Sequence, residues 1–287
     1  MYRACIDVGG TFTDCLILDA QGSLEAFKVP STVPDHSVGI MNSLEVAAGG
    51  YGKRPGEFLE EVDLIVHGTT LATNALLTGR GAKVAMLTTK NFRDVIEIRR
   101  GFKNVRTSMF NLFGPPYKPL VSRRLHFTVE ERTLFNGEIV TPLSELEVGQ
   151  AIERIKAAGV EAIAICFLHS YVNSANEDRA ATICKELING LYVTSSHEVL
   201  PIWREYERFS TTVVSAAIGP IASQYLNRLE ERLKEKGFKG SLLILQANGL
   251  VQTPQESIRR LSTSWVRDLP PHHQRPSTAR GWLRRTI

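Results

Sequence analysis

The sequence predicts an α/β protein in which buried strands alternate with helices after an opening β-hairpin. Three short and nearly continuous apolar runs, each followed by a segment with helical spacing, indicate the buried strands: 62–67, 83–89 and 160–168. Before them, two alternating apolar segments flank a glycine-rich turn between residues 5 and 19, which is typical of a hairpin. With 287 residues, 43% hydrophobic and 22% charged, the chain can hold one large domain or two modest ones.

The turn of this hairpin combines glycines and threonines with a carboxylate on each side: Asp7, Gly9, Gly10, Thr11, Thr13 and Asp14. Glycine lets backbone N–H groups approach an anion closely, such turns form concave phosphate sites, and threonine hydroxyls add donors. Two aspartates would repel a bare phosphate, but they suit Mg²⁺, which is often held by one or two carboxylates and substrate phosphates. We therefore predict a nucleotide-phosphate hairpin with Asp7 and Asp14 as metal ligands; the alternative is an ordinary tight turn. The pattern is neither a Walker loop nor a dinucleotide fingerprint.

A strand and a helix follow the hairpin. Residues 24–29 alternate as a strand that ends at Pro30. Asp35 is placed to cap a helix that extends to about Ala48, where the glycine-rich segment 49–52 stops it.

Small polar residues follow the buried strand at 62–67. His67 ends this strand, and the next helix opens at Thr69 and Thr70 and includes Asn74. Ligands of α/β sheets bind beyond the carboxyl ends of the strands, where helices begin. We therefore expect this segment to form an edge of the nucleotide or substrate site; the alternative is that a threonine merely caps the helix.

The second half of the chain continues the alternation after an irregular stretch. Residues 101–120 are rich in Gly, Pro, Asn and Phe and predict an irregular segment, whereas 121–142 alternate as β structure. The next helix is expected to begin at 141–144, with Pro142 near its first turn. Gly219-Pro220 predicts a kink or restart in a long helix. The later expected elements are a helix at 176–187, a strand at 192–195, a helix at 210–237 and a strand at 242–246.

A histidine–glutamate pair precedes the long helix. His197 and Glu198 could perform acid–base chemistry on an amide or orient a catalytic group. His169 lies at the carboxyl end of its strand, where a site is also expected. The alternative for these residues is a structural role, and for Glu207 and Arg208 a simple surface ion pair.

The positive charge of the chain is concentrated at its C-terminal end. Five arginines and one aspartate give residues 262–287 a net charge of +4, which equals that of the whole chain. The remainder is therefore neutral, which excludes a basic domain of the nucleic-acid-binding type.

Cysteine usage and hydropathy predict a cytoplasmic protein. The four cysteines are scattered in apolar segments, which predicts buried thiols rather than disulfides: Cys5, Cys15, Cys166 and Cys184. No apolar run approaches the ~20 residues of a membrane span, and the chain begins directly in a strand without a signal peptide.

Several motifs resemble those of a known superfamily. The segment Asp7-Val-Gly-Gly-Thr-Phe-Thr-Asp14 resembles the first phosphate loop of the actin-like ATPases. It is more closely similar to the start of the hydantoinase/oxoprolinase A family, which contains ATP-dependent 5-oxoprolinases, N-methylhydantoinases and subunits of acetone and acetophenone carboxylases. Further similar segments are His67–Ala75 (H-G-T-T-x-A-T-N-A), Asn91–Arg100 (G-F-R-D-x-L-x-I-x-R), Leu168–Tyr171 (L-H-S-Y) and Ser196–Arg208 (S-H-E-V-x-P-x-x-R-E-Y-E-R). Together they cover roughly residues 1–261.

The resemblance implies an actin-like ATPase fold, of ribonuclease-H-like type, with an inserted β-rich segment and a truncated second lobe. Residues 1–195 would form the first lobe, 196–261 the start of the second lobe, and 262–287 a basic tail outside the family pattern. The implied cofactors are ATP and Mg²⁺. The implied partners are a hydantoinase B-type subunit or domain and a small cyclic amide substrate.

The resemblance also implies a function, the ATP-dependent hydrolysis of a cyclic amide such as 5-oxoproline or a hydantoin. Phosphorylation of the amide oxygen would make the amide susceptible to water. Glu130 lies in the inserted segment where the family places substrate-proximal polar residues. The expected substrate-side residues are His67, Glu130, His197 and Glu198. The alternatives are a subunit of an ATP-dependent ketone carboxylase, or a non-catalytic remnant that acts as an interaction module.

The sequence departs from the family pattern near its C-terminal end. Gln246-Ala-Asn-Gly-Leu250 stands where the family reads Q-S-N-G-G, and 262–287 lacks the glycine-rich loops of the other half of the nucleotide site. A shifted reading frame or a misjoined gene model is the expected explanation, and a genuine basic disordered tail is the alternative. We expect such a fragment to bind nucleotide weakly or not at all.

Overall fold

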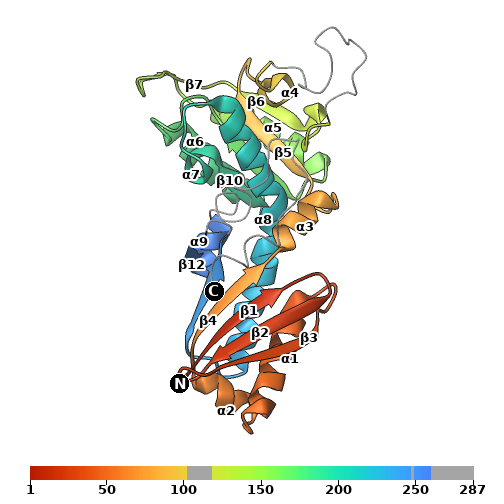
Figure 1. Cartoon of the computed structure of the whole chain (residues 1–287). Coiled ribbons are helices and arrows are strands. Elements are labelled where there is room, and N and C mark those ends of the chain that lie inside the picture. Colours follow the sequence, from red (N-terminus) through yellow and green to blue (C-terminus); the bar gives the residue numbers. More distant parts are fainter. Residues whose placement is uncertain (102–117, 247–248, 260–287) are drawn as a thin grey trace.

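The computed structural model describes residues 1–101, 118–246 and 249–259, which form two bodies joined by one long helix (Figure 1). The first body contains the N-terminal strands and the second the middle of the chain, and each has its own hydrophobic core. Most of the irregular segment expected at 101–120, residues 247–248 of the altered family motif, and the whole tail 262–287 lie outside the described residues.

The first body is built on a six-stranded sheet. In spatial order its strands are β12 (Val251–Gln252), β11 (Ser241–Leu245), β4 (Val62–Thr69), β1 (Tyr2–Val8), β2 (Phe12–Leu18) and β3 (Leu24–Pro30). Strands β1 to β3 form an antiparallel meander, whereas β4 and β11 run parallel to β1. The opening hairpin and the ribonuclease-H-like arrangement predicted from the sequence are therefore confirmed.

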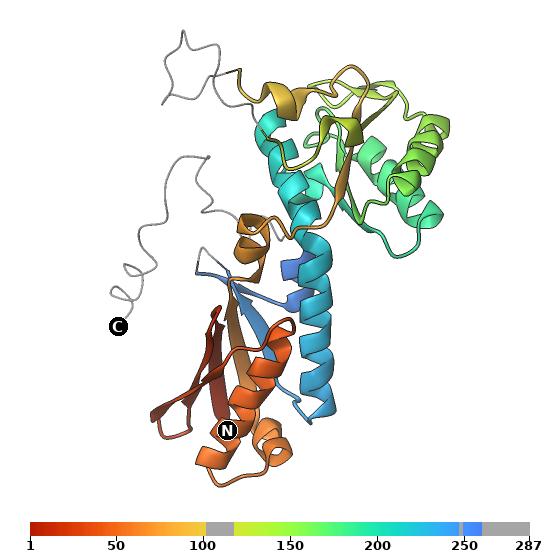
Figure 2. The same ribbon diagram turned by 90° about the vertical axis from the view of Figure 1, so that its right-hand side faces the viewer.

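Helices cover one face of this sheet (Figure 2). They are α1 (His36–Gly50), α2 (Pro55–Glu60) and the C-terminal half of α8 (Glu205–Glu235). Along β1, Ala4, Ile6 and Val8 are buried on this face, and Cys5 and Asp7 are exposed on the other. The prediction of four buried thiols is therefore wrong for Cys5, because its neighbours occupy the inward positions of the strand. The other three cysteines are buried.

The second body is built on a parallel sheet of four strands. In spatial order they are β10 (Tyr192–Ser195), β9 (Ala162–Cys166), β5 (Val84–Thr89) and β6 (His126–Val129). Helices α5 (Glu145–Ala157) and α6 (Ala175–Leu187) lie on one side, and the N-terminal half of α8 lies on the other (Figure 2). Every residue of β5 and β9 is buried, as their apolar runs predicted. The shorter elements are α3 (Leu71–Leu77), α4 (Val95–Ile98), the 3₁₀ turn η1 (Arg123–Leu125), β7 (Arg132–Thr133), β8 (Ile139–Thr141), α7 (Ser196–Val199) and α9 (Pro254–Arg259).

Helix α8 belongs to both bodies. Residues up to Ala217 pack into the core of the second body, and those from Ile218 onward pack into the core of the first. The helix continues without interruption through Pro220, so the predicted restart and the predicted beginning at residue 210 are wrong. Gly219 instead serves packing, since a Cβ there would lie 2.2 Å from a ring carbon of Tyr192.

Two helices begin at capping residues that are recognisable in the sequence. The Asp35 carboxylate accepts the Ser37 N–H (3.1 Å) and caps α1 as predicted. Helix α5 begins after the N-cap Ser144, and Pro142 lies just before its first turn, near the expected position. The sequence analysis missed α2, which has only six residues. No helix among the described residues has both the length and the apolar character needed to cross a membrane.

Candidate functional site

The hairpin of β1 and β2 brings the two predicted metal ligands together. Asp7 stands opposite Asp14 in the antiparallel register, and both residues are exposed. The Gly9 N–H donates to the Phe12 carbonyl at 3.0 Å and closes the turn. A Cβ at Gly10 would meet no atom within 4 Å, so the tip of the turn is open. An anion can therefore reach the backbone at the tip, beside the carboxylates.

The two carboxylates differ in their electrostatic surroundings. Lys28 on β3 donates to the Asp14 carboxylate at 2.7 Å. The Asp7 carboxylate forms no hydrogen bond or ion pair with the described residues, and partial burial together with the charge of Asp14 raises the pKa of this group. The described residues contain no group of three or more His, Cys, Asp or Glu side chains that could hold a metal by themselves. Two carboxylates beside an open turn nevertheless fit Mg²⁺ that also binds nucleotide phosphates.

The threonines of the turn have different positions. Thr11 is exposed at the tip, whereas Thr13 is completely buried. The Ser31 hydroxyl donates to the Gly9 carbonyl (2.9 Å) and lies 3.0 Å from the Thr13 hydroxyl, from which it therefore accepts. Thr13 thus braces the turn from inside the sheet and does not present its hydroxyl beside the carboxylates, contrary to the expectation. Strand alternation explains why Thr13 is buried and Thr11 is not, because Thr13 occupies an inward position of β2.

The end of β4 adjoins the hairpin. Gly68 stands opposite Asp7 in the parallel register, and a Cβ there would lie 3.3 Å from the Asp7 carboxylate. The Thr69 hydroxyl accepts the first N–H of α3 at 3.2 Å, and the Thr70 hydroxyl accepts from the Asn74 amide at 3.1 Å. Thr69 stands opposite Val8 in the same register, and the hydroxyls of Thr69 and Thr70 bond locally at the start of α3. That these residues form an edge of a nucleotide or substrate site stays a prediction.

His67 is completely buried, although it neighbours the site. Its Nδ1 lies 3.2 Å from the Ile6 carbonyl oxygen and its Nε2 lies 2.7 Å from the Tyr225 hydroxyl. Both ring nitrogens are thus used within the protein. His67 therefore does not face a substrate in this structure, contrary to the expectation.

The other expected catalytic residues lie in the second body. Glu130, at the end of β6, is exposed and 3.4 Å from the Lys90 ammonium. His197 and Glu198 lie in α7, which Figure 1 places with the second sheet and away from the β1–β2 turn. The Glu198 carboxylate lies 3.4 Å from the Arg259 guanidinium. The structure therefore does not bring these three residues to the hairpin.

His197 belongs instead to a buried network centred on Glu177, which the sequence analysis did not single out. The Glu177 carboxylate accepts from the Phe167 N–H (2.7 Å), the Ser196 hydroxyl (2.6 Å), and both the N–H (3.1 Å) and Nδ1 (2.8 Å) of His197. Burial alone would lower the pKa of His197, but the hydrogen bond to Glu177 and the charges of Glu177, Asp178 and Glu198 together raise that pKa. The sequence signal for Glu177 was only that of an acidic residue in the first turn of a helix.

Arg208 binds the carbonyl of the residue whose N–H Glu177 accepts. Its buried guanidinium donates to the Phe167 carbonyl (2.6 Å) and to the Ile202 carbonyl (3.0 Å). Glu177 and Arg208 therefore hold the N–H and the carbonyl of Phe167, which belong to two consecutive peptide groups, and the alternative of a surface pair for Arg208 is wrong. Two residues further on, His169 has a left-handed backbone (φ 54°). The polar motif around residues 196–208 thus fixes the end of β9.

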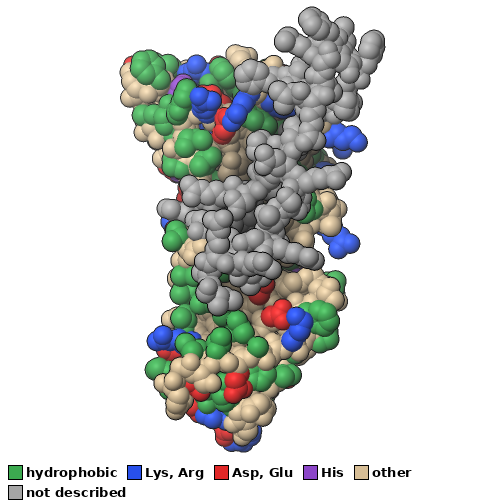
Figure 3. All heavy atoms as spheres, in the orientation of Figure 1, with side chains coloured by type: hydrophobic (Ala, Val, Ile, Leu, Met, Phe, Trp, Pro, Cys, Tyr) green, Lys and Arg blue, Asp and Glu red, His purple; other side chains and the backbone are tan. Residues whose placement is uncertain are grey.

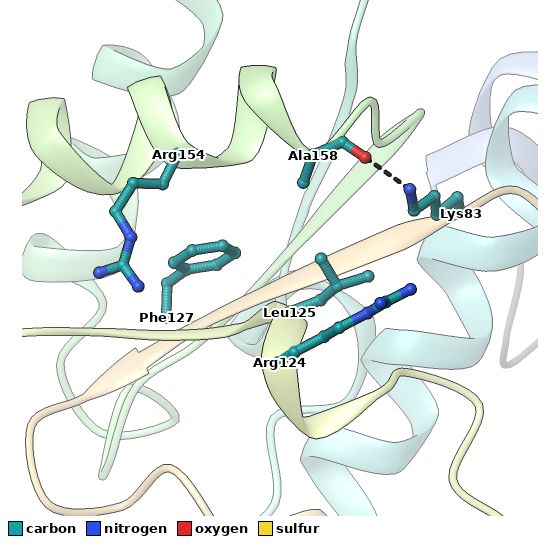
Figure 4. A pocket seen from close by; sticks show the side chains of 6 residues that line it. All are labelled: Lys83, Arg124, Leu125, Phe127, Arg154 and Ala158. Carbon is teal, nitrogen blue, oxygen red and sulfur yellow. Dashed lines mark hydrogen bonds between the residues drawn. The ribbon is translucent and has the colours of Figure 1, made fainter.

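A separate cavity of about 370 Å³ lies beside β6, the edge strand of the second sheet (Figure 4). Its lining residues are Lys83, Arg124, Leu125, Phe127, Arg154 and Ala158. The Lys83 ammonium donates to the Ala158 carbonyl at the end of α5, and the Arg154 guanidinium lies over the Phe127 ring at 5.2 Å. These contacts give two of its three cations a structural role. None of the predicted site residues lines this cavity.

The sheet order of the first body and the open turn with paired carboxylates define the first lobe of an actin-like ATPase. Residues 3–188 match the family model described as the hydantoinase/oxoprolinase N-terminal region, and residues 208–265 match the model described as hydantoinase/oxoprolinase. The chain belongs to the hydantoinase/oxoprolinase family, as its motifs indicated.

Relatives of known activity differ in the reaction that their names state. The caprolactamase alpha subunit of Pseudomonas jessenii is 38% identical over 86% of this chain and 36% of its own length. The acetophenone carboxylase gamma subunit of Aromatoleum aromaticum is 33% identical over 85% of this chain and 35% of its own.

Solved structures agree with this assignment. Nucleotide-free acetone carboxylase superposes with a TM-score of 0.82 at 26% identity, and the ATP-dependent caprolactamase of Pseudomonas jessenii with 0.80 at 35%. Each match covers 91% of this chain and 38% of the solved chain. The present chain therefore spans little more than a third of the length of these relatives.

Proposed function

We propose that this chain binds Mg·ATP at the β1–β2 hairpin and forms the nucleotide-binding part of an ATP-dependent enzyme that hydrolyses cyclic amides. The observation that carries the proposal is the cross-strand pair of Asp7 and Asp14 beside an open glycine turn. The similarity to the caprolactamase alpha subunit supports a cyclic amide as the substrate class.

The residues of the hairpin would divide the work of holding the nucleotide. Backbone N–H groups of Gly10 and Thr11 would bind phosphate oxygens, and Asp7 and Asp14 would hold Mg²⁺. Lys28 would orient the Asp14 carboxylate through its 2.7 Å contact. When bound, ATP would supply the phosphoryl group that activates the amide oxygen. A B-type subunit or domain would complete the reaction, and relatives named as subunits support such a partner.

A second candidate is that the chain is part of a cytoplasmic subunit of an ATP-dependent ketone carboxylase. The observation that favours it is the similarity to acetophenone carboxylase in sequence and to acetone carboxylase in structure. The hairpin would serve the same role in both enzymes, so the two candidates differ in the substrate and not in the nucleotide site.

Calorimetric titration with Mg·ATP tests the nucleotide site. We expect weak but saturable binding by the unmodified chain, loss of binding in Asp7→Ala, and at least about tenfold weaker binding in Asp14→Ala. Glu25→Ala is the matched control, because Glu25 is an exposed carboxylate on β3 without a hydrogen bond or ion pair to the described residues. The absence of binding by a chain that melts cooperatively would refute the proposal and favour a non-catalytic interaction module.

Phosphate release in the presence of a B-type partner then separates the two reactions. Stimulation by a lactam or 5-oxoproline without bicarbonate supports the hydrolase. Stimulation only by a ketone together with bicarbonate supports the carboxylase.

A further inference from the structure

His67 links three elements that meet behind the hairpin. It stands next to Ile6 in the parallel register of β1 and β4, and its side chain is completely buried. Its Nδ1 is 3.2 Å from the Ile6 carbonyl oxygen of β1, and its Nε2 is 2.7 Å from the Tyr225 hydroxyl of α8. The imidazole ring therefore connects a strand of the hairpin to the helix that spans both bodies.

The chemistry of the partners fixes which nitrogen carries the proton. A carbonyl oxygen can only accept, so Nδ1 of His67 must donate to Ile6. Complete burial lowers the pKa of His67 to about 4, so the ring is neutral near pH 7 and Nε2 is an acceptor. Burial also raises the pKa of Tyr225, whose hydroxyl therefore keeps its proton and donates it to Nε2. The hydrogen bonds run in one direction, from Tyr225 through His67 to Ile6.

This series of hydrogen bonds ends at the backbone next to Asp7, the proposed metal ligand. Ile6 immediately precedes Asp7, and the residue after His67 is Gly68, which stands opposite Asp7 and approaches its carboxylate closely. A change in the position of the imidazole would therefore move the backbone on both sides of the Asp7 carboxylate.

We propose that His67 is a positioning residue for the Mg·ATP hairpin, which holds the Ile6 carbonyl through Nδ1 and is itself held by Tyr225 from α8. The proposal rests on the proposed nucleotide function and adds a residue to it. In contrast, a histidine that only fills the core would affect stability but leave the nucleotide affinity of the folded chain unchanged.

Two substitutions separate the two hydrogen bonds. In His67→Asn, the side-chain amide nitrogen can occupy the place of Nδ1 and donate to Ile6, but nothing reaches Tyr225. In His67→Gln, the longer amide reaches toward Tyr225 and loses the donor near Ile6. Tyr225→Phe removes only the hydroxyl and leaves the ring of His67 in place.

The test compares the Mg·ATP dissociation constants of these variants, measured by calorimetry below their melting temperatures. We expect His67→Asn to stay within about threefold of the unmodified chain and His67→Gln to bind at least about tenfold more weakly. Tyr225→Phe should lie between them, because the ring loses its fixed orientation. Equal affinity of folded His67→Gln and the unmodified chain would overturn the proposal.

A measurement on the unmodified protein keeps the proposal falsifiable if a variant does not fold. Long-range ¹H–¹⁵N correlation spectra distinguish the two neutral tautomers of a histidine. A pyrrole-type Nδ1 and a pyridine-type Nε2 for His67 support the proposed chain of bonds, and the reverse pattern overturns it. If the folded unmodified chain binds no Mg·ATP, the proposed function fails, and the positioning role fails with it even when the tautomer is as expected.

Discussion

Acid should destabilise this protein through His67 in a way that a single substitution can isolate. Burial lowers the pKa of His67 from its ordinary value of 6.5 to about 4. In this interval the unfolded chain binds a proton that the folded chain excludes, so stability falls as the pH falls from 6.5 toward 4. At 1.36 kcal/mol per unit, the full effect is about 3 kcal/mol, of which about 2 kcal/mol is lost by pH 5.

Urea unfolding of the unmodified chain and His67→Asn, followed by circular dichroism at pH 7.5, 6 and 5, measures this effect. The substitution costs stability at every pH through lost packing, but only the histidine adds a titrating group. The difference in unfolding free energy between the two proteins should therefore shrink by about 2 kcal/mol between pH 7.5 and 5. Contributions of other titrating groups are shared and cancel. A difference that stays constant over this range would refute the reasoning, since it would mean that His67 titrates normally in the folded state.

Three further predictions concern other parts of the fold. Gly219→Ala should destabilise the protein by about 2 kcal/mol in thermal or urea unfolding, because the added methyl group would clash with the ring of Tyr192. Tyr192→Leu in the same chain should reduce that cost, and additive effects of the two changes would contradict this explanation. Glu177→Gln should lower the free energy of unfolding by about 3 kcal/mol, because a neutral amide replaces a carboxylate that accepts several hydrogen bonds. It should also lower the pKa of His197 in an NMR titration, and an unchanged titration would show that the His197–Glu177 contact is absent in solution. Cys5 should be the thiol of the native chain that iodoacetamide labels first, because it is exposed and the other three are buried. Partial burial and the charge of Asp7 raise the pKa of its thiol, so labelling should quicken toward alkaline pH. Mg·ATP should slow the reaction because Cys5 lies on the exposed face of β1 beside Asp7, and equally fast labelling of two or more thiols in a peptide map would contradict the prediction.

The sequence predicted the elements whose signals are local. The continuous apolar runs of β5 and β9, the cap at Asp35 and the hairpin around its glycine turn all depend on neighbouring residues. The same local pattern also contained the correct orientation of Thr13, since inward and outward positions alternate along a strand. The expectation for Thr13 is wrong because strand alternation, and not the hydroxyl chemistry of the turn, sets the direction of its side chain.

Helix α8 shows where a local rule is overridden by packing. Proline inside a helix removes one backbone hydrogen bond and costs about 3 kcal/mol, which favours a break. Residues on both sides of Pro220 nevertheless bury apolar side chains in two different cores, and this burial keeps the helix continuous. The sequence contains the apolar residues, but it does not say that two separate cores would share them.

The sequence by itself determined the family, the β1–β2 hairpin and the residue types of its candidate site, because these are encoded within short segments. Only the tertiary structure decided that His67 faces Tyr225, that His197 serves Glu177, and that these residues do not face a common substrate. Tyr225 is 158 positions from His67, and no local periodicity specifies contacts over such a separation. Such pairs form because burial removes water as a hydrogen-bonding partner, so each buried polar group must find its partner wherever the packed strands and helices place one.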